Sequence, residues 1–308
     1  MTKTKTNWSQ YNKNLIKRGN IDLWIAKDIE KWWYAKAVPE KGRPQVYSEK
    51  AIEMCLMLRH IYQLPLRMAE GFINSLFARL NIPLKCPSYT QLSRRAGTFE
   101  VPKLAIKPGI PVNLIFDSTG LKVFGEGEWK VRMHGKSKRR TWMKLHAAVN
   151  PDTLEFIATV LTSNAVTDSA AATQIMSSEL DGKINTVSGD GAYDKSEFYK
   201  QACSIGALTV VPPASNARMQ KLLHPAMISR DESIAKIKLY GNDEAARKRW
   251  KEEVGYHSRS LAETAMFRFK TAFSDRLQSR SFAAQSTEVF LKTNILNTYA
   301  SMGFLRSF

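Results

Sequence analysis

The chain has 308 residues, 44% of them hydrophobic and 10% aromatic, so it can form the core of one large domain or of two ordinary ones. No apolar run could span a membrane, no signal-peptide core is present, and the three cysteines are too scattered for a zinc site, so we expect a cytoplasmic protein. With 46 Lys plus Arg against 28 Asp plus Glu, the net charge of +18 favours nucleic acid as a partner over a basic but inert surface.

The N-terminal third of the chain is predicted to be helical. Four stretches favour helices: residues 20–36, 49–63, 65–80 and 90–99. Ser48 is a suitable cap for the second stretch, and Pro65 opens the third. Helices joined by tight breaks, the last of them with Arg94 and Arg95, are typical of a helix-turn-helix that reads DNA, although any small helical bundle has the same pattern.

A proline-rich linker at residues 100–112 separates this region from one with a different pattern. Strands are expected first, at 112–117, at 120–131 and in two runs around a turn at 150–152. Then follow helix 167–180, strand 184–190, helix 195–207, strand 208–213, a loose charged stretch at 216–255, and helices 256–270 and 287–302. This order predicts a mixed α/β sheet with packed helices. We predict a helical DNA-binding domain at 1–105 and an α/β catalytic domain at 106–308.

Three acidic residues stand apart in the α/β region. Asp117 and Asp190 each end an apolar run that is predicted to be a strand, Asp190 between two glycines, and Glu263 lies on the helix at 256–270. Buried carboxylates are costly unless they are paired or bound to a cation. Oxygen ligands suit Mg²⁺ or Mn²⁺, and such a cluster in a basic protein indicates metal-assisted phosphoryl transfer on nucleic acid. A single Asp at a strand end is, however, usually a turn former or a helix cap, as we expect for Asp194.

The helix at 256–270 presents four different polar groups on one face. At 100° per residue, Tyr256, Arg259, Glu263 and Lys270 share an arc of about 60°. Glu263 would complete the metal site, while Arg259 and Lys270 would hold phosphates beside it, Lys270 lying about 10 Å further along the axis. The alternative is a polar face that is merely solvated.

A basic patch at residues 130–144 contains seven Lys or Arg. Its candidate DNA contacts are Lys136, Lys138, Arg139, Arg140 and Trp142. Basic side chains on this predicted hairpin would follow DNA phosphates, and the indole could stack on an unpaired base. The alternative is a solvated hairpin whose Trp lies in the core.

Three segments together resemble the catalytic blocks of bacterial insertion-sequence DDE transposases. They are residues 115–125 (IFDSTGLKVFG), 188–194 (SGDGAYD) and 256–270 (YHSRSLAETAMFRFK). The last matches the Tyr-x2-Arg-x3-Glu-x6-Lys signature of one large transposase group at all four positions, and 73 residues separate each of the three acids from the next. Residues 51–77 and 88–95 are similar to the helix-turn-helix region of the IS-five-like branch.

The resemblance implies a ribonuclease-H-like catalytic domain in which Asp117, Asp190 and Glu263 are catalytic and bind two Mg²⁺ or Mn²⁺ ions. It also implies binding to the terminal inverted repeats of an insertion sequence, cleavage at the element ends, and joining of the 3′ ends to target DNA. The partners would be double-stranded DNA and at least one further copy of the chain, at the bacterial nucleoid. Arg259 and Lys270 would contact this DNA, and Tyr256 would either contact it or orient Glu263.

Two alternatives remain open from the sequence. A metal-dependent nuclease or resolvase of the same fold would cut DNA without joining it. A transposase-derived DNA-binding regulator would have lost catalysis, and it would not need Asp117 or Glu263.

Overall fold

The computed structural model describes residues 7–36, 44–101, 111–123, 142–178, 183–220 and 224–302. The chain divides into two compact units, the first made of residues 1–101 and 278–308 and the second of residues 102–277. The last helix therefore groups with the N-terminal helices, although the sequence led us to include it in the α/β domain. The functional boundary near residue 105 stays a prediction.

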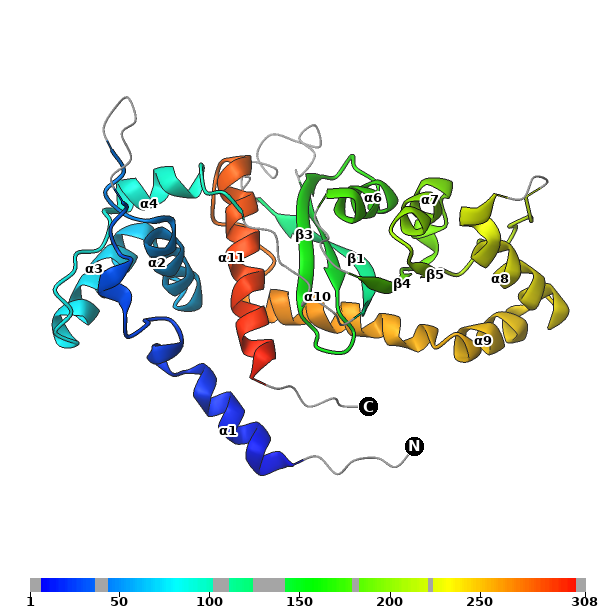
Figure 1. Ribbon diagram of the computed structural model, residues 1–308, viewed down its shortest axis with the longest axis horizontal. Coiled ribbons are helices and arrows are strands. Elements are labelled where there is room, and N and C mark those ends of the chain that lie inside the picture. The colour runs from blue at the N-terminus through cyan, green and yellow to red at the C-terminus, as the bar shows by residue number, and fades with distance from the viewer. Residues whose placement is uncertain are drawn as a thin grey trace, which may run out of the picture. The chain divides into compact units, whose positions relative to one another are not determined.

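The first unit consists of helices (Figure 1). They are α1 (Trp8–Arg18), α2 (Glu49–Ile61), α3 (Leu66–Arg79), α4 (Tyr89–Ala96) and α11 (Phe282–Ser301). The Ser48 hydroxyl accepts a hydrogen bond from the Ala51 backbone N–H at 3.1 Å, so α2 begins at the predicted cap. Ser88 and Gln91 form a capping box that begins α4.

One predicted helix of this unit is wrong. Residues 20–36 contain two 3₁₀ turns, η1 (Ile21–Leu23) and η2 (Ile29–Lys31), and the α-helix of this region is α1 instead. The cause is the burial of Trp33, whose indole N–H donates to the Lys85 carbonyl at 2.9 Å and whose ring packs edge-on against Phe77. Tertiary packing here overrides local helix propensity.

The second unit is built on a five-stranded sheet with the order β3-β2-β1-β4-β5. Its strands are β1 (Val112–Lys122), β2 (Trp142–Val149), β3 (Phe156–Ser163), β4 (Ile184–Ser188) and β5 (Leu208–Val210). β1, β2 and β3 pair antiparallel, whereas β4 is parallel to β1 and β5 is parallel to β4. This mixed sheet confirms the predicted α/β class and is consistent with a ribonuclease-H-like domain.

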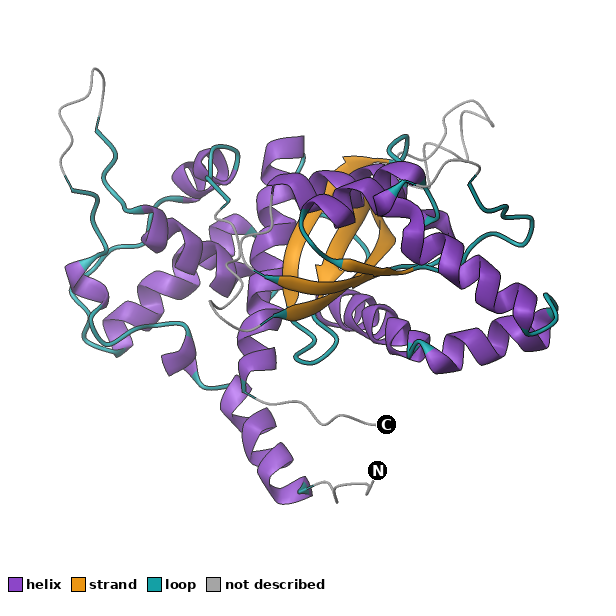
Figure 2. Ribbon diagram, turned by 45° about the vertical axis from the view of Figure 1, so that its right-hand side comes forward, coloured by secondary structure: helices purple, strands orange, loops and turns teal. Residues whose placement is uncertain are grey.

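Helices cover both faces of the sheet (Figures 1 and 2). On one face lie α6 (Asp168–Ser178) and α7 (Ser196–Ser204), which share a core with Leu114 and Phe116 of β1. On the other face α10 (Ser260–Phe273) packs against β1. Because side chains alternate along a strand, Asp117 points toward the face that α10 covers.

The charged stretch at 216–255 was predicted to be loose, and this is wrong, because it contains α8 (Ile228–Leu239) and α9 (Glu244–Glu253). The Asp243 carboxylate caps α9 by accepting a hydrogen bond from the Ala246 N–H at 2.7 Å. Ile237, Ala246 and Trp250 form a small buried cluster between the two helices.

Within the described ranges, no helix is long and apolar enough to cross a membrane.

Candidate active site

Asp117 lies inside β1 and not at its end, as the sequence led us to expect, because the strand continues to Lys122. Its side chain is only 15% exposed, and its partner across the antiparallel pair is the small residue Ala147. Burial raises the pKa of Asp117, although a backbone hydrogen bond from Ser118 and the nearby Arg259 act to lower it. A carboxylate in this setting is stabilised by a neighbouring cation.

Asp190 follows β4, as predicted. The parallel pairing aligns Ser188, the last residue of β4, with Ile115 of β1, so the chain beyond Ser188 runs beside Asp117. The Asp190 Oδ1 atom accepts a hydrogen bond from the Ala192 N–H at 2.8 Å and thereby caps the 3₁₀ turn η3 (Gly191–Tyr193). This contact holds the carboxylate in place and leaves Oδ2 available to a cation.

Glu263 lies in the first turn of α10. The predicted helix at 256–270 in fact begins as a 3₁₀ turn, η5 (Tyr256–Arg259), and becomes α-helical only at Ser260. Gly255 precedes it with a φ of 67°, a left-handed conformation that favours glycine and redirects the chain after α9. Because α10 packs against β1, Glu263 comes to the face of the sheet toward which Asp117 points.

The Arg259 guanidinium joins the three acidic residues, which we call the acidic triad (Asp117, Asp190 and Glu263). Its Nη1 atom is 2.5 Å from Glu263 Oε1, and its Nη2 atom is 3.8 Å from Asp117 Oδ1 and 3.6 Å from Asp190 Oδ2. Burial acts to lower the pKa of Arg259, but Tyr256 and the triad outweigh it and raise the pKa above its usual value. Carboxylates from three separate elements therefore converge on one cation.

The donor chemistry of the acidic triad fits a divalent ion. Its ligands are oxygen only, the type that Mg²⁺ and Mn²⁺ prefer, and all three carboxylates already neutralise one positive charge. Among the residues that the structure describes, no group of three or more His, Cys, Asp and Glu side chains is drawn together into a ready-made metal site. Because the Arg259 guanidinium already pairs with the oxygens of the acidic triad, Arg259 and a divalent ion would compete for them.

The two outer residues of the helix signature differ in position. Tyr256 is half-buried, with its ring 6.3 Å from that of Trp250 and the Lys251 Nζ atom 5.6 Å from its centre. Burial raises the pKa of Tyr256, and the charges of the acidic triad act in the same direction, whereas Arg259 acts to lower it. Lys270 makes no ion pair within the described part of the chain. The pKa of Asp275 is lowered by its hydrogen bond with Lys122, and the charge of Lys270 lowers it further.

The predicted DNA contacts of the helical unit fall into two kinds. Arg94 is exposed on α4, where its Nε donates to the Thr90 carbonyl at 3.3 Å. Arg95 is 15% exposed, pairs with the Glu49 carboxylate, and donates from Nη1 to the Tyr47 carbonyl at 3.2 Å. Arg95 thus links α4 to the start of α2, and a DNA contact for it stays a prediction.

The predicted basic hairpin is described only from Trp142, the first residue of β2. Its half-buried ring lies over Gly120, where a Cβ atom would meet it at 3.4 Å, and the Lys122 Nζ atom is 5.8 Å from the ring centre. The ring therefore packs partly on β1. Four further predicted contacts lie outside the described residues: Lys136, Lys138, Arg139 and Arg140.

Sequence reasoning missed a partly buried ion pair between Asp194, four residues beyond Asp190, and Arg230. Asp194, expected to cap a helix, accepts hydrogen bonds from Arg230 Nε at 2.6 Å, from the Tyr199 hydroxyl at 3.1 Å and from the Ala214 N–H at 3.0 Å. Although burial opposes it, Arg230 lowers the pKa of Asp194. The pair ties the segment after Asp190 to α8, and its separation of 36 residues carries no periodic signal in the sequence.

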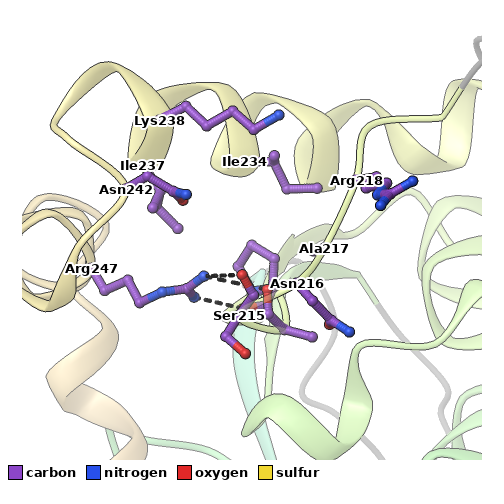
Figure 3. A pocket seen from close by; sticks show the side chains of 11 residues that line it. Ser215, Asn216, Ala217, Arg218, Ile234, Ile237, Lys238, Asn242 and Arg247 are labelled. Atoms are coloured by element: carbon purple, nitrogen blue, oxygen red, sulfur yellow. Dashed lines mark hydrogen bonds between the residues drawn. The ribbon is translucent and has the colours of Figure 1, made fainter.

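A separate cleft of about 300 Å³ lies between α8, α9 and the chain that follows β5 (Figure 3). The Arg247 guanidinium points across it and donates to the carbonyls of Pro213, Ala214 and Ser215 at 2.9–3.3 Å. The role of Arg247 is structural, because backbone carbonyl oxygens accept the hydrogen bonds of its guanidinium. No residue of the acidic triad lines the cleft.

Comparison with known families agrees with this geometry. Two family models, each described as a transposase DDE domain, match residues 16–126 and residues 109–298. The second match covers more than half of the chain and includes the sheet, the acidic triad and Arg259. The matches do not distinguish a branch, so the IS-five-like assignment stays a prediction. The chain belongs to the DDE transposase family, whose activities are DNA transposition and recombination.

Proposed function

We propose that the chain is the transposase of a bacterial insertion sequence. It binds the terminal inverted repeats of the element, cleaves DNA at the element ends, and joins the 3′ ends to target DNA. The family match supports polynucleotidyl transfer. The observation that carries the assignment of the site is the convergence of Asp117, Asp190 and Glu263 on the guanidinium of Arg259.

In this proposal the acidic triad holds two Mg²⁺ or Mn²⁺ ions, in keeping with the general use of divalent metals in the family. When bound, such ions activate an attacking oxygen and stabilise the leaving oxygen of a phosphodiester. The pairing of β1 fixes Asp117, and the Ala192 N–H fixes Asp190, so both carboxylates are preorganised by the backbone. Glu263 is 57% exposed and can adjust to the ions and to the DNA.

Arg259 would exchange its carboxylate partners for a DNA phosphate. A guanidinium pairs with phosphate through two parallel hydrogen bonds. The Arg259 Nε atom is buried and has no hydrogen-bond partner in the described segments, so its N–H group can donate to a phosphate oxygen. Lys270 would hold a neighbouring phosphate, and Tyr256 would either contact the DNA or orient Glu263.

The proposed partners follow from the reaction. The chain acts on double-stranded DNA, both at the terminal repeats and at the target, and the net charge of +18 favours its approach to this polyanion. Two ends must be brought together, so at least two copies of the chain assemble on DNA. The site of action is the nucleoid in the bacterial cytoplasm.

One assay separates this function from its alternatives. The full chain is incubated with Mg²⁺, a labelled duplex that carries the inverted repeats flanking its gene, and a supercoiled plasmid. Labelled plasmid is expected, and it should disappear when EDTA replaces Mg²⁺. Hydrolysis of the duplex without joining would instead favour the nuclease or resolvase, and specific binding with neither reaction would favour the regulator.

A further inference from the structure

A cleft of about 550 Å³ lies on the helical unit between the first turn of α3 and the exposed side of α4. Its polar lining consists of Arg67, Tyr89, Thr90, Ser93 and Arg94. We propose that this cleft binds the phosphate backbone of duplex DNA. The inference deepens the proposed function, since it assigns part of the surface that would hold the terminal repeats.

The two arginines of the cleft have their charges available. Arg67 is exposed, and its guanidinium carbon lies 4.6 Å above the centre of the Tyr89 ring, a cation–π contact that orients the group without using its N–H donors. Arg94 uses one donor on the Thr90 carbonyl. Neither arginine makes an ion pair within the described residues.

The acidic side chains around the cleft are already engaged. Glu70, on the second turn of α3, accepts a hydrogen bond from the Tyr89 N–H at 2.7 Å. Glu49 is paired with Arg95, which is held inward and does not line the cleft. The cleft therefore has two positive charges that no acidic side chain of the described residues neutralises, and this favours an anionic ligand. Guanidinium groups match the geometry of phosphate well.

The arrangement favours a duplex over a single strand. Single-strand sites rely on bases that stack on open aromatic faces, but the Tyr89 ring is half-buried and Arg67 covers one face. Thr90 and Ser93 are exposed residues beside Arg94, and hydroxyls commonly bind phosphate oxygens, although the Thr90 hydroxyl also lies 3.0 Å from that of Ser88. Only residues 62–65 separate α2 from α3, a short connection of the length found in helix-turn-helix motifs.

The test is a binding titration of the full chain, without divalent metal, by fluorescence anisotropy. The probes are a duplex with the repeats flanking the gene, a scrambled duplex of equal length, and a single strand. We expect Arg67→Gln and Arg94→Gln each to weaken binding of both duplexes by about tenfold and to lower the salt slope by about one. Arg67→Lys should retain most of the affinity. Arg79→Gln, exposed at the far end of α3 and outside the cleft, is the matched control.

Duplex binding by Arg67→Gln and Arg94→Gln with the wild-type salt slope would overturn the inference, as would a loss confined to the single strand. Circular dichroism and thermal melting of each variant exclude unfolding as the cause. The result is separable from the proposed function, which depends on the acidic triad. Normal DNA binding by both cleft variants, together with strand transfer that requires Asp117, would refute the cleft alone.

Discussion

At the scale of single residues, Arg259 is the group that sets the electrostatics of the active site. Three carboxylates that would otherwise repel one another share its guanidinium. Attraction of this kind amounts to about 4 kcal/mol for a pair of charges 4 Å apart near a protein surface, and less where solvent reaches the pair, as it does at Asp190 and Glu263. Any divalent ion that binds the triad must displace part of this interaction.

The first prediction concerns this competition. Arg259→Gln removes the guanidinium but keeps a polar side chain of similar length, so we expect Mn²⁺ to bind the DNA-free chain about tenfold more tightly. Isothermal titration calorimetry measures the affinity, and Arg276→Gln, an exposed arginine after α10, is the control. The same variant should melt at a lower temperature in EDTA, since the triad then lacks a neutralising charge. An unchanged or weaker Mn²⁺ affinity would show that Arg259 does not compete.

The second prediction separates the two glycines that flank Asp190. A Cβ atom at Gly189 would lie 2.5 Å from Tyr193 Cδ2, whereas one at Gly191 would meet only the Pro212 carbonyl at 3.8 Å. Tyr193 is buried in the sheet core, so Gly189→Ala should destabilise the chain by about 1–3 kcal/mol and reduce strand transfer by moving Asp190. Gly191→Ala is the matched control. Equal melting temperatures and activities for the two variants would contradict the packing argument.

At the scale of elements, a buried polar cluster joins α11 to α2. The Lys292 Nζ atom is 2.6 Å from Glu288 Oε1, and both side chains are at most 3% exposed. Glu288 also accepts hydrogen bonds from the N–H groups of Gln278 and Ser279, which anchor the start of the C-terminal segment. His60 of α2 is buried, and the charges of Glu288 and Lys292 act on its pKa in opposite directions.

The third prediction tests this cluster. Glu288→Ala leaves the Lys292 ammonium buried without its partner, so we expect a loss of about 3–5 kcal/mol in stability. Urea unfolding followed by circular dichroism measures the change. Glu244→Ala, on the exposed first turn of α9, should unfold as the wild type does. A wild-type midpoint for Glu288→Ala would mean that the ion pair adds nothing to the attachment of α11.

The fourth prediction is the acid sensitivity of the same cluster. Burial lowers the pKa of His60 to about 3, so its neutral form contributes stability that is lost as the pH falls from 6.5 toward 3. Although burial opposes it, Lys292 lowers the pKa of Glu288 to about 2, and this contribution is lost between pH 4.5 and 2. In His60→Leu, the melting temperature should fall less than in the wild type between pH 6.5 and 5. Parallel curves for the two proteins over that interval would contradict the assignment.

The elements that could be predicted were those with strong local signals. Ser48 marked the start of α2, the turn at 150–152 separated β2 from β3, and short apolar runs indicated the strands of the sheet. The helices α8 and α9 were missed because charge was taken as a sign of loose chain, although Glu, Ala, Arg and Lys are strong helix formers and Asp243 is a good cap. Residues 20–36 failed for the opposite reason, since long-range packing of Trp33 decides their structure.

At the scale of the whole molecule, the three acidic residues whose carboxylates converge on one cation could be identified from the sequence. The contacts that bring them together could not. Asp117 was expected at a strand end, and it lies inside β1. It meets Asp190 through the parallel register of β1 and β4, and it meets Glu263 because α10 packs on the face toward which Asp117 points. Neither that register nor the Asp194–Arg230 pair could be derived from local patterns, since both join residues far apart in the chain.

The role of the acidic triad in strand transfer is tested most directly by isosteric substitutions of its members. Asp117→Asn, Asp190→Asn and Glu263→Gln are assayed with Mg²⁺ for both cleavage and joining, with Glu244→Gln on α9 as the control. Each triad variant should lose at least about 100-fold in both steps, because the metal contribution is worth several kcal/mol. DNA binding without metal should stay within about threefold of the wild type. Cleavage and joining at wild-type rates in any one of the three variants would contradict the assignment of that carboxylate to the catalytic site.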